Sequence, residues 1–437
     1  MQVGRAAGER EARCERGRRV VSEWERVVVT GMGAVTAAGI GFDRLWEALL
    51  AGRCFVSPIE CCDTSAVGVH VSAEIKDFDP TATGVLDRKQ ARRADRYEQF
   101  ARIAAAEAWE QAGIDMQDED PTRIGVCIGS GCGGLTSILA SDARLIETGS
   151  ARRMNPLLGT MMEANMAAGQ VAITYGLKGQ CTCVTTACAT GAHSIGEAVR
   201  AVRHGYQDVM VCGGAEAALT AMGLGAFDNL TALSRSEDPA MASLPFDERR
   251  SGFVLGEGAG VIVIESLSHA RARGAEVLGE IVGFGSTCDA HHVTAPDPDA
   301  DGAARAISMA LDEGGIDPSE LDYYNAHGTA TKLNDEAEAK ALHRVCGGHA
   351  GEVLVSSVKG NIGHTIGACG AIEACVTMRA LAEGRVPGTC GCTCPDGSLD
   401  VWTSPETVEM RDMRYAVSVN LGFGGHNAAL AFARWGE

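Results

Sequence analysis

Short apolar runs alternate along the chain with longer stretches in which apolar residues recur every three or four positions. The runs are rich in Val and Ile and predict β-strands covered on both faces. They span residues 26–36, 123–131, 208–218 and 258–266. Between them, residues 97–113 and 193–203 have the spacing of helices. This alternation of strands and helices predicts an α/β fold.

Two parts of the chain repeat the same order of features. The segments that begin at Ala108 and Ala310 each contain a helix end, Gly-Ile-Asp, a polar turn and a strand that ends in small residues. A weaker similarity relates residues 191–198 to residues 367–374, which both open with Gly-Ala and close with Glu-Ala. The first pair lies about 200 residues apart, too far for a solenoid repeat, and therefore predicts a duplicated domain.

The repeat divides the chain into two halves packed into one body. The N-terminal half spans residues 26–270 and the C-terminal half spans residues 271–437. Residues 1–25 are rich in Arg and Glu and lack the apolar stretch of a secretory signal. We expect these residues to form a solvated, poorly ordered extension.

The composition narrows the classes of function. With 46% hydrophobic and 22% charged residues, the chain is typical of a globular protein, and its net charge of −19 argues against nucleic-acid binding. No apolar run approaches the length of about 18 residues that a membrane-spanning helix needs. We therefore expect no membrane association and a cytoplasmic location.

The chain contains 17 cysteines, and without a secretory signal we interpret them as reduced thiols, mostly small core residues. Cys390, Cys392 and Cys394 alternate along one stretch and could hold a soft metal ion, but no matching Cys/His pair follows them. A surface loop rich in small residues is the favoured interpretation, and no metal site is predicted.

One cysteine, Cys188, lies in a run of small and threonine residues at 183–192. Ala189, Gly191 and Ala192 leave room for a molecule to approach. A thiol in the first turn of the helix that follows would feel the positive end of the helix dipole and free N–H groups, and both favour the thiolate. The run predicts a nucleophile, although an inert buried cysteine would have the same surroundings.

Three further stretches carry the groups that a thiolate nucleophile would need. His327 lies at the end of a predicted strand, and Lys359 and His364 lie in a Gly-rich loop before a helix. Phe423 lies among glycines, whose backbone can present free N–H groups to an oxyanion. A lone His near a strand end is more often structural than catalytic, and a Lys beside Gly is usually a solvated charge. The sequence alone does not show that these residues converge.

Four motifs follow one another in order: Thr-Ala-Cys-Ala-Thr-Gly at 186–191, Asn-Ala-His-Gly-Thr at 325–329, Gly-Asn-Ile-Gly-His at 360–364 and Gly-Phe-Gly-Gly at 422–425. In these motifs and their spacing, the chain resembles the β-ketoacyl-acyl-carrier-protein synthases of the thiolase superfamily, over the stretch from Arg26 to Ala433. The resemblance implies a thiolase-like fold of two duplicated βαβαβαββ halves in five α/β layers, usually in a dimer.

The resemblance also implies a role for each matching residue. Cys188 matches the nucleophile that takes the acyl chain as a thioester. His327 and His364 match the pair that binds the malonyl thioester, promotes decarboxylation and stabilises the enolate. Lys359 matches the active-site lysine. Phe423 matches the gating residue, and its N–H group and that of Cys188 match the oxyanion hole. No cofactor or metal is implied, because the substrates are carried on the phosphopantetheine of acyl carrier protein.

Other matches concern the support of the site. Glu373 matches the ion-pair partner of the lysine. His426 stands where the family commonly has Thr, beside Asn427, which we expect to support the site. Cys132 stands where fatty-acid-elongating members tend to have a larger aliphatic residue in the acyl pocket. Met161 and Met162 are candidates for the same lining, although Met on a helix is more often a core residue.

A basic segment on this acidic chain matches the family's docking site for the acidic carrier protein. It contains Arg88, Lys89, Arg92 and Arg93. A solvated helix face would have the same composition, but electrostatic docking of a negatively charged partner is the favoured interpretation.

The leading hypothesis is a β-ketoacyl synthase that condenses malonyl-acyl carrier protein with an acyl chain held on Cys188, by decarboxylative Claisen chemistry. The small Cys132 and the unusual motif variants favour type II polyketide biosynthesis, in which the chain would pair with a chain-length-factor-like subunit. The alternative is a fatty-acid-elongating ketosynthase, which would be a homodimer. Two further alternatives are a cysteine thioester hydrolase, which would leave the second His and the Lys without a role, and a non-catalytic partner subunit.

Overall fold

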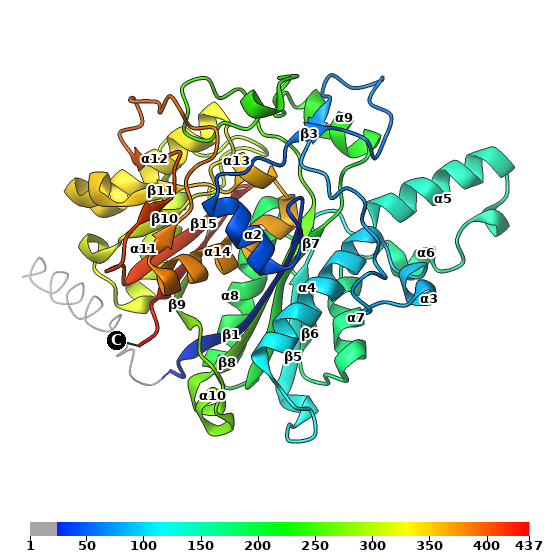
Figure 1. Cartoon of the computed structure of the whole chain (residues 1–437), viewed down its shortest axis with the longest axis horizontal. Coiled ribbons are helices and arrows are strands. Elements are labelled where there is room, and N and C mark those ends of the chain that lie inside the picture. The colour runs from blue at the N-terminus through cyan, green and yellow to red at the C-terminus, as the bar shows by residue number, and fades with distance from the viewer. Residues whose placement is uncertain (1–23, 437) are drawn as a thin grey trace, which may run out of the picture.

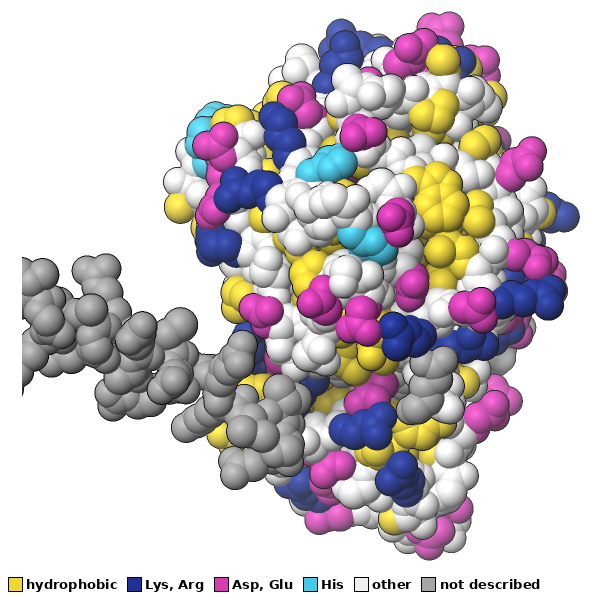
Figure 2. All heavy atoms as spheres, turned by 90° about the vertical axis from the view of Figure 1, so that its left-hand side faces the viewer, with side chains coloured by type: hydrophobic (Ala, Val, Ile, Leu, Met, Phe, Trp, Pro, Cys, Tyr) yellow, Lys and Arg dark blue, Asp and Glu magenta, His cyan; other side chains and the backbone are white. Residues whose placement is uncertain are grey.

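The computed structural model describes residues 24–436. The extension predicted for residues 1–25 therefore lies outside the described residues, apart from its last two. Among the described residues, no helix combines the length and the apolar character needed to cross a membrane. On the face shown in Figure 2, Lys and Arg side chains are interspersed with Asp and Glu, so no continuous basic field covers that face.

One mixed sheet of 12 strands runs through the protein, in the order β13-β11-β10-β15-β16-β9-β1-β8-β7-β5-β6 with β2 paired to β1 (Figure 1). Its longer strands are β1 (Val27–Thr36), β5 (Ile124–Gly129), β7 (Val209–Glu216), β8 (Gly258–Ser266), β9 (Gly279–Cys288), β15 (Tyr415–Gly422) and β16 (His426–Ala433). Its short strands are β2 (Gly39–Ile40), β6 (Cys181–Thr182), β10 (Tyr323–Asn325), β11 (Leu354–Ser356) and β13 (Trp402–Thr403). Two small two-stranded sheets lie apart from it, β3 (Ser57–Pro58) with β4 (Val71–Ser72) and β12 (Arg385–Val386) with β14 (Val408–Glu409).

The helices divide between the faces of this sheet. The larger ones are α2 (Phe42–Leu50), α4 (Arg96–Ala112), α5 (Leu135–Thr148), α7 (Met166–Tyr175), α8 (Thr190–Arg203), α9 (Ala221–Asn229), α11 (Asp301–Gly314), α12 (Lys332–Cys346) and α14 (Cys369–Glu383). The shorter ones are α3 (Arg88–Ala91), α6 (Leu158–Met161), α10 (Leu267–Arg273) and α13 (Lys359–Ile362). All four strands and both helices predicted from periodicity are confirmed, with ends shifted by a few residues.

The duplication is visible in the order of elements. The N-terminal half runs β1-α4-β5-α7-β6-α8-β7-β8, and the C-terminal half runs β9-α11-β10-α12-β11-α14-β15-β16. Each is a βαβαβαββ unit with the same order of strands across the sheet. The halves join where β1 pairs with β9 through only two residue pairs, Val28 with Glu280 and Val29 with Gly279.

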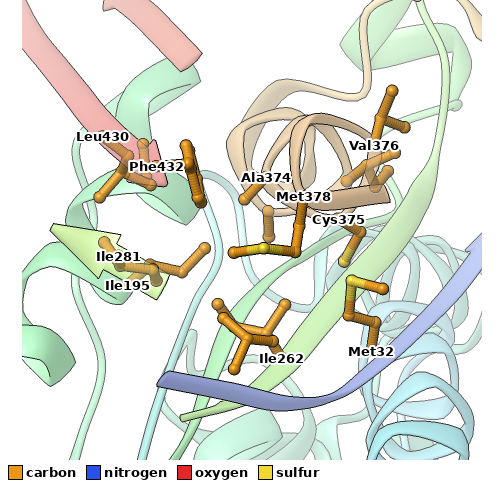
Figure 3. Close-up of a cluster of buried hydrophobic side chains, with 14 of the residues drawn as sticks. Met32, Ile195, Ile262, Ile281, Ala374, Cys375, Val376, Met378, Leu430 and Phe432 are labelled. Atoms are coloured by element: carbon orange, nitrogen blue, oxygen red, sulfur yellow. The ribbon is translucent and has the colours of Figure 1, made fainter. Parts of the chain in front are cut away.

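Five layers result from this duplication. Helices α4 and α7 cover the outer face of the N-terminal strands, and α11 and α12 pack on the outer side of the C-terminal half. Helices α8 and α14 pack against each other between the two halves of the sheet. Figure 3 shows the resulting core, in which Cys375 and Met378 of α14 lie among side chains of several strands, including Met32, Ile262 and Ile281. This central layer matters because the nucleophile lies at the start of α8.

Candidate active site

Cys188 lies in a single 3₁₀ turn, Ala187–Ala189, that leads directly into α8. Ala187 has φ of +50°, a left-handed conformation that is strained for a residue with a side chain. Strain of this kind at one residue before a reactive group is typical of functional sites. The turn is held by a hydrogen bond from the N–H of Thr186 to Oγ1 of Thr190, at 2.8 Å.

The small residues after Cys188 serve helix packing. A Cβ on Gly191 would lie 2.7 Å from the nitrogen of Ala371, and a Cβ on Gly370 would lie 2.6 Å from the nitrogen of Ala192. Helices α8 and α14 therefore approach closely through residues without bulky side chains. The prediction that these residues leave room for an approaching molecule is wrong, because α14 fills the space.

Cys188 and the two predicted histidines meet at one cavity. The Sγ of Cys188 and ring nitrogens of His327 and His364 lie within 4.8 Å of one another, and all three residues are buried. The cavity has a volume of about 360 Å³, and Phe423 and Asn427 also line it. Four stretches far apart in the sequence thus converge, as the resemblance implied.

Burial controls the state of the nucleophile. It raises the pKa of the Cys188 thiol to about 12, and the Lys359 charge and the N–H groups of Phe423 and Cys188 only partly offset this. The side chain packs in an apolar cluster with Leu219, Phe253 and Ile366. Burial therefore works against the thiolate that the helix start is expected to favour.

This pKa gives a testable result. We expect the rate at which iodoacetamide alkylates Cys188 to rise about tenfold for each pH unit between about pH 7 and pH 10, because the thiolate fraction keeps growing below the pKa. Peptide mass spectrometry of the 183–192 region measures the rate, with free glutathione as the reference thiol. A rate for Cys188 that levels off below about pH 9 would contradict the proposed burial effect.

His327 follows β10 and is fixed through its backbone. Glu338 of α12 accepts hydrogen bonds from the N–H groups of His327 and Gly328, at 2.7 and 2.6 Å. On the ring, the Nδ2 of Asn420 lies 3.5 Å from Nδ1 of His327. Because the amide faces this nitrogen with a donor, the neutral ring carries its proton on Nε2.

His364 follows α13 and has a similar arrangement. The N–H of Ile366 donates to Nδ1 of His364 at 3.3 Å, so the proton of this ring is also on Nε2. Its ring centre lies 5.1 Å from that of His327 and 5.1 Å from that of Phe253. Burial, reinforced by the Lys359 charge, holds the pKa of both histidines well below the ordinary value, so both rings are neutral donors at neutral pH.

The predicted ion pair of Lys359 and Glu373 is present and fully buried. Asn420 donates its Nδ2 to Oε2 of Glu373 at 2.6 Å, which fixes the amide orientation that His327 meets. Burial alone would lower the pKa of Lys359, but the Glu373 charge reverses this and raises it above the ordinary value. Lys359 does not line the cavity, so it acts on the site through Glu373 and Asn420 and through its charge.

Phe423 lies in the turn between β15 and β16, and its backbone is close enough to the sulfur of Cys188 to lower the pKa of that thiol. Its ring centre lies 6.4 Å from that of Phe227. Asn427 supports the turn by donating its Nδ2 to Oδ1 of Asp289 at 2.7 Å. The ring of His426 lies 6.4 Å from that of His193, and His426 does not line the cavity.

Other predicted residues lie outside this cavity. Cys132 is exposed, Met161 is buried and Met162 is half-exposed, and the structure does not bring these three candidates for the acyl pocket into contact with it. The docking candidates are all exposed, on α3 and just after it: Arg88, Lys89, Arg92 and Arg93. In the described part of the chain, Cys390, Cys392 and Cys394 do not form a group with the proximity of metal ligands.

The sequence reasoning missed three polar residues that hold the site. Glu338 fixes the backbone at His327 and Asn420 orients its ring, as described above. Glu216, at the end of β7, accepts from the N–H groups of Gly131 and Gly367, at 2.8 and 3.1 Å. It thereby joins the loop after β5 to the turn before α14. A lone carboxylate at the end of an otherwise apolar strand was the available signal for Glu216.

Comparison with known proteins places these features in one family. Family models described as "Beta-ketoacyl synthase, N-terminal domain" and "Beta-ketoacyl synthase, C-terminal domain" match residues 24–270 and 278–393. The chain is 44% identical to a "3-oxoacyl-[acyl-carrier-protein] synthase 2" of Synechocystis, over 94% of this chain and 99% of the relative. It is 43% identical to a protein of the same name from Staphylococcus aureus, over 95% and 100%.

Solved structures show the same likeness. A β-ketoacyl synthase from Burkholderia phymatum superposes with a TM-score of 0.85 at 35% identity, over 94% of this chain and 99% of the other. The ishigamide ketosynthase/chain length factor superposes with a TM-score of 0.87 at 33% identity, over 94% and 100%. A type II polyketide ketosynthase in complex with its acyl carrier protein gives 0.87 at 28% identity, over 95% and 100%.

Proposed function

The chain belongs to the β-ketoacyl synthase family and is a condensing acyltransferase. From this premise we propose that it elongates fatty acyl chains by condensing malonyl-acyl carrier protein with an acyl group on Cys188. The observation that carries the assignment of roles is the convergence of Cys188, His327 and His364 within 4.8 Å at a buried cavity. Cys188, His327 and His364 each have a separate role in the proposed reaction.

In the first half-reaction, the sulfur of Cys188 attacks the thioester carbonyl of the acyl carrier. The N–H groups of Cys188 and Phe423, which also lower the pKa of the Cys188 thiol in the free protein, stabilise the negative charge on the carbonyl oxygen. The carbon–sulfur bond to pantetheine breaks, and the thiol proton passes to the departing sulfur. The histidines do not take this proton, since each has a donor facing Nδ1 and already carries a proton on Nε2.

In the second half-reaction, the malonyl thioester loses carbon dioxide, and the electron pair of the broken bond forms an enolate. The two Nε2–H groups of His327 and His364 donate to the enolate oxygen, a task that needs neutral donors rather than bases. The enolate carbon then attacks the acyl group on Cys188. A carbon–carbon bond forms and the sulfur leaves as thiolate, which takes up one proton from solvent because its pKa is high.

We propose that this chemistry needs no metal or cofactor. A histidine that binds a metal through Nε2 usually donates a proton from its other ring nitrogen to an acceptor. Here Nδ1 of His364 faces the N–H of Ile366 and Nδ1 of His327 faces the amide of Asn420, which supports hydrogen-bond donation into the cavity. Incubation with a strong chelator is expected to leave the condensation rate unchanged.

The relatives bear on the pathway. The sequence-based preference was type II polyketide biosynthesis, but proteins named 3-oxoacyl-[acyl-carrier-protein] synthase 2, at 43–44% identity, support the fatty-acid alternative better. The polyketide structures resemble the chain less closely, at 28% and 33% identity. We therefore propose fatty-acyl elongation. A cytoplasmic location stays a prediction.

A homodimer is the assembly that fits this proposal. Strand β6 lies at the open edge of the sheet with both of its residues exposed, and an unpaired edge is a site for pairing with another chain. Ile146 and Ile173, 76% and 73% exposed, lie on helices of the same half. Sedimentation equilibrium of the purified chain is expected to show a dimer without a second polypeptide, whereas a monomer that dimerises only with a chain-length factor would favour the polyketide alternative.

The test of the function is intact mass of the protein after incubation with a medium-chain acyl-acyl carrier protein, followed by malonyl-acyl carrier protein. We expect an acyl adduct on Cys188 that disappears on the second addition and yields a β-ketoacyl product two carbons longer. Release of free acid without malonate would support a hydrolase instead. No adduct at all would support a non-catalytic subunit.

Carrier docking gives a separate prediction. We expect the double change Arg88→Glu and Arg92→Glu to raise the KM for acyl-acyl carrier protein about tenfold, because these exposed cations would attract an acidic partner. The kcat/KM for an acyl-N-acetylcysteamine thioester, which lacks the carrier, is expected to stay unchanged. Arg411→Glu, a charge reversal at an exposed arginine of the other half, is the control. Equal losses with both substrates would contradict docking at this segment.

A further inference from the structure

Two cysteines far apart in the sequence meet at the surface. Cys54 follows α2 and is exposed, and Cys390 is half-buried in the loop between β12 and β13. The Sγ of Cys390 lies 3.4 Å from the carbonyl oxygen of Gly52, two residues before Cys54, and each thiol perturbs the pKa of the other. The proposed condensation uses neither thiol.

The backbone on both sides of the pair is fixed against α13. The N–H of Phe55 donates to the carbonyl oxygen of Asn361 at 2.8 Å, and Nδ2 of Asn361 donates to the carbonyl oxygen of Arg53 at 2.9 Å. The carbonyl oxygen of Cys390 lies so close that a Cβ on Gly360 would be 2.1 Å from it. These contacts hold the two sulfurs beside each other at the surface of the turn that carries Lys359.

The two thiols differ in access and acidity. Cys54 lines a surface hollow of about 630 Å³, together with Arg44 and Lys76, which gives a small reagent access to its sulfur. The neighbouring Cys390 thiol and the backbone of Val56 lower the pKa of Cys54 to about 7. Cys54 is therefore the more accessible and the more acidic of the two thiols, and Cys390 lies close to it.

We propose that Cys54 and Cys390 are a redox-active dithiol that a low-molecular-weight disulfide converts into an intramolecular disulfide. The Cys54 thiolate attacks one sulfur of the reagent, the reagent's S–S bond breaks, and one half leaves as thiolate. The Cys390 thiol gives its proton to that thiolate, and its sulfur attacks Cys54. The mixed disulfide breaks, and the second half leaves as thiolate and is protonated by solvent. The protein loses two electrons, and the reagent gains them as two thiols.

The test uses the full-length protein with oxidised glutathione near neutral pH, followed by peptide mapping without reduction. We expect a mass lower by two hydrogens and a cross-linked pair of peptides that dithiothreitol separates. Both peptides contain other cysteines, Cys61 and Cys62 in one and Cys392 and Cys394 in the other, so fragment ions must assign the bonded sulfurs. The first step is expected to be about threefold faster than for a free thiol of ordinary pKa, since a larger thiolate fraction outweighs a lower nucleophilicity.

Variants separate the two steps. Cys390→Ser is expected to stop at a stable glutathione adduct on Cys54, and Cys54→Ser to lose the cross-link. Cys394→Ser, which removes a neighbouring thiol, is the control and is expected to cross-link as the unchanged protein does. A wild-type protein that accumulates the adduct on Cys54 with Cys390 free would overturn the proposal, and so would a cross-link from Cys54 to any other cysteine.

Discussion

Replacing Cys188 with Ala is expected to abolish the acyl-enzyme and to lower the condensation rate at least about a thousandfold, because no other group at the cavity can form the thioester. The neighbouring buried thiol of Cys369 points elsewhere, with its sulfur 3.2 Å from the carbonyl oxygen of Cys188. The measurements are intact mass after incubation with acyl-acyl carrier protein and the rate of β-ketoacyl product formation.

The same variant separates the two half-reactions. The histidines keep their partners Asn420 and Ile366 when the sulfur is removed, so decarboxylation of malonyl-acyl carrier protein is expected to continue. Cys61→Ser, at an exposed thiol, is the control for cysteine removal and is expected to retain condensation. Condensation by the Cys188→Ala protein at more than a hundredth of the normal rate would contradict the assignment of Cys188 as the nucleophile.

The elements that the sequence predicted well are the long ones, whose apolar pattern is either continuous or periodic. β1 and β8 are buried at every position, so a continuous apolar run was enough to predict them. β10 and β11 have only three residues each, and β6 has two. Such short strands carry no measurable period and are defined by their neighbours in the sheet, and of these three the internal repeat suggested only β10.

The catalytic residues of the candidate site could be predicted because they lie in recognisable sequence motifs. The residues that hold them in place were harder to predict. Glu338 lies on α12 in a stretch rich in charged residues, which indicates a solvated helix face. Its side chain is buried because two N–H groups of the His327 loop, left unpaired by the strand, need an acceptor. Glu338 becomes the acceptor for these N–H groups only because the fold brings the His327 loop against α12. The local sequence around Glu338 therefore does not show that its side chain is buried.

The pKa of Cys188 shows the same limit. The helix dipole at Cys188 depends only on residues next to it in the sequence. The desolvation that raises the pKa of its thiol comes from Leu219, Phe253 and Ile366, which are distant in the sequence. A local favourable effect of about one kcal/mol is smaller than the cost of a buried charge. Burial therefore raises the pKa of the thiol above its ordinary value.

Replacing His327 or His364 with Ala is expected to lower the rates of decarboxylation and condensation by about 10²- to 10³-fold each, because each removes one donor to the enolate oxygen. Acylation of Cys188 is expected to continue, since its oxyanion is stabilised by backbone N–H groups. His349→Asn is the control, because that histidine lies on the distant η7 turn (Gly347–Glu352) and bonds to the carbonyl oxygen of Leu321. A variant of either residue that loses acylation but keeps decarboxylation would reverse the assigned roles.

The pH dependence of decarboxylation tests how the pair works. Burial holds the pKa of both histidines well below the ordinary value of 6.5, and the neutral rings are the active donors. Protonation would therefore lower the rate only under acidic conditions, and we expect a rate that is flat between about pH 6 and pH 8. Measuring it in the Cys188→Ala protein removes the contribution of the thiol. A rate that falls with a midpoint near 6.5 would show that the rings titrate as exposed histidines do, and that burial does not set their state.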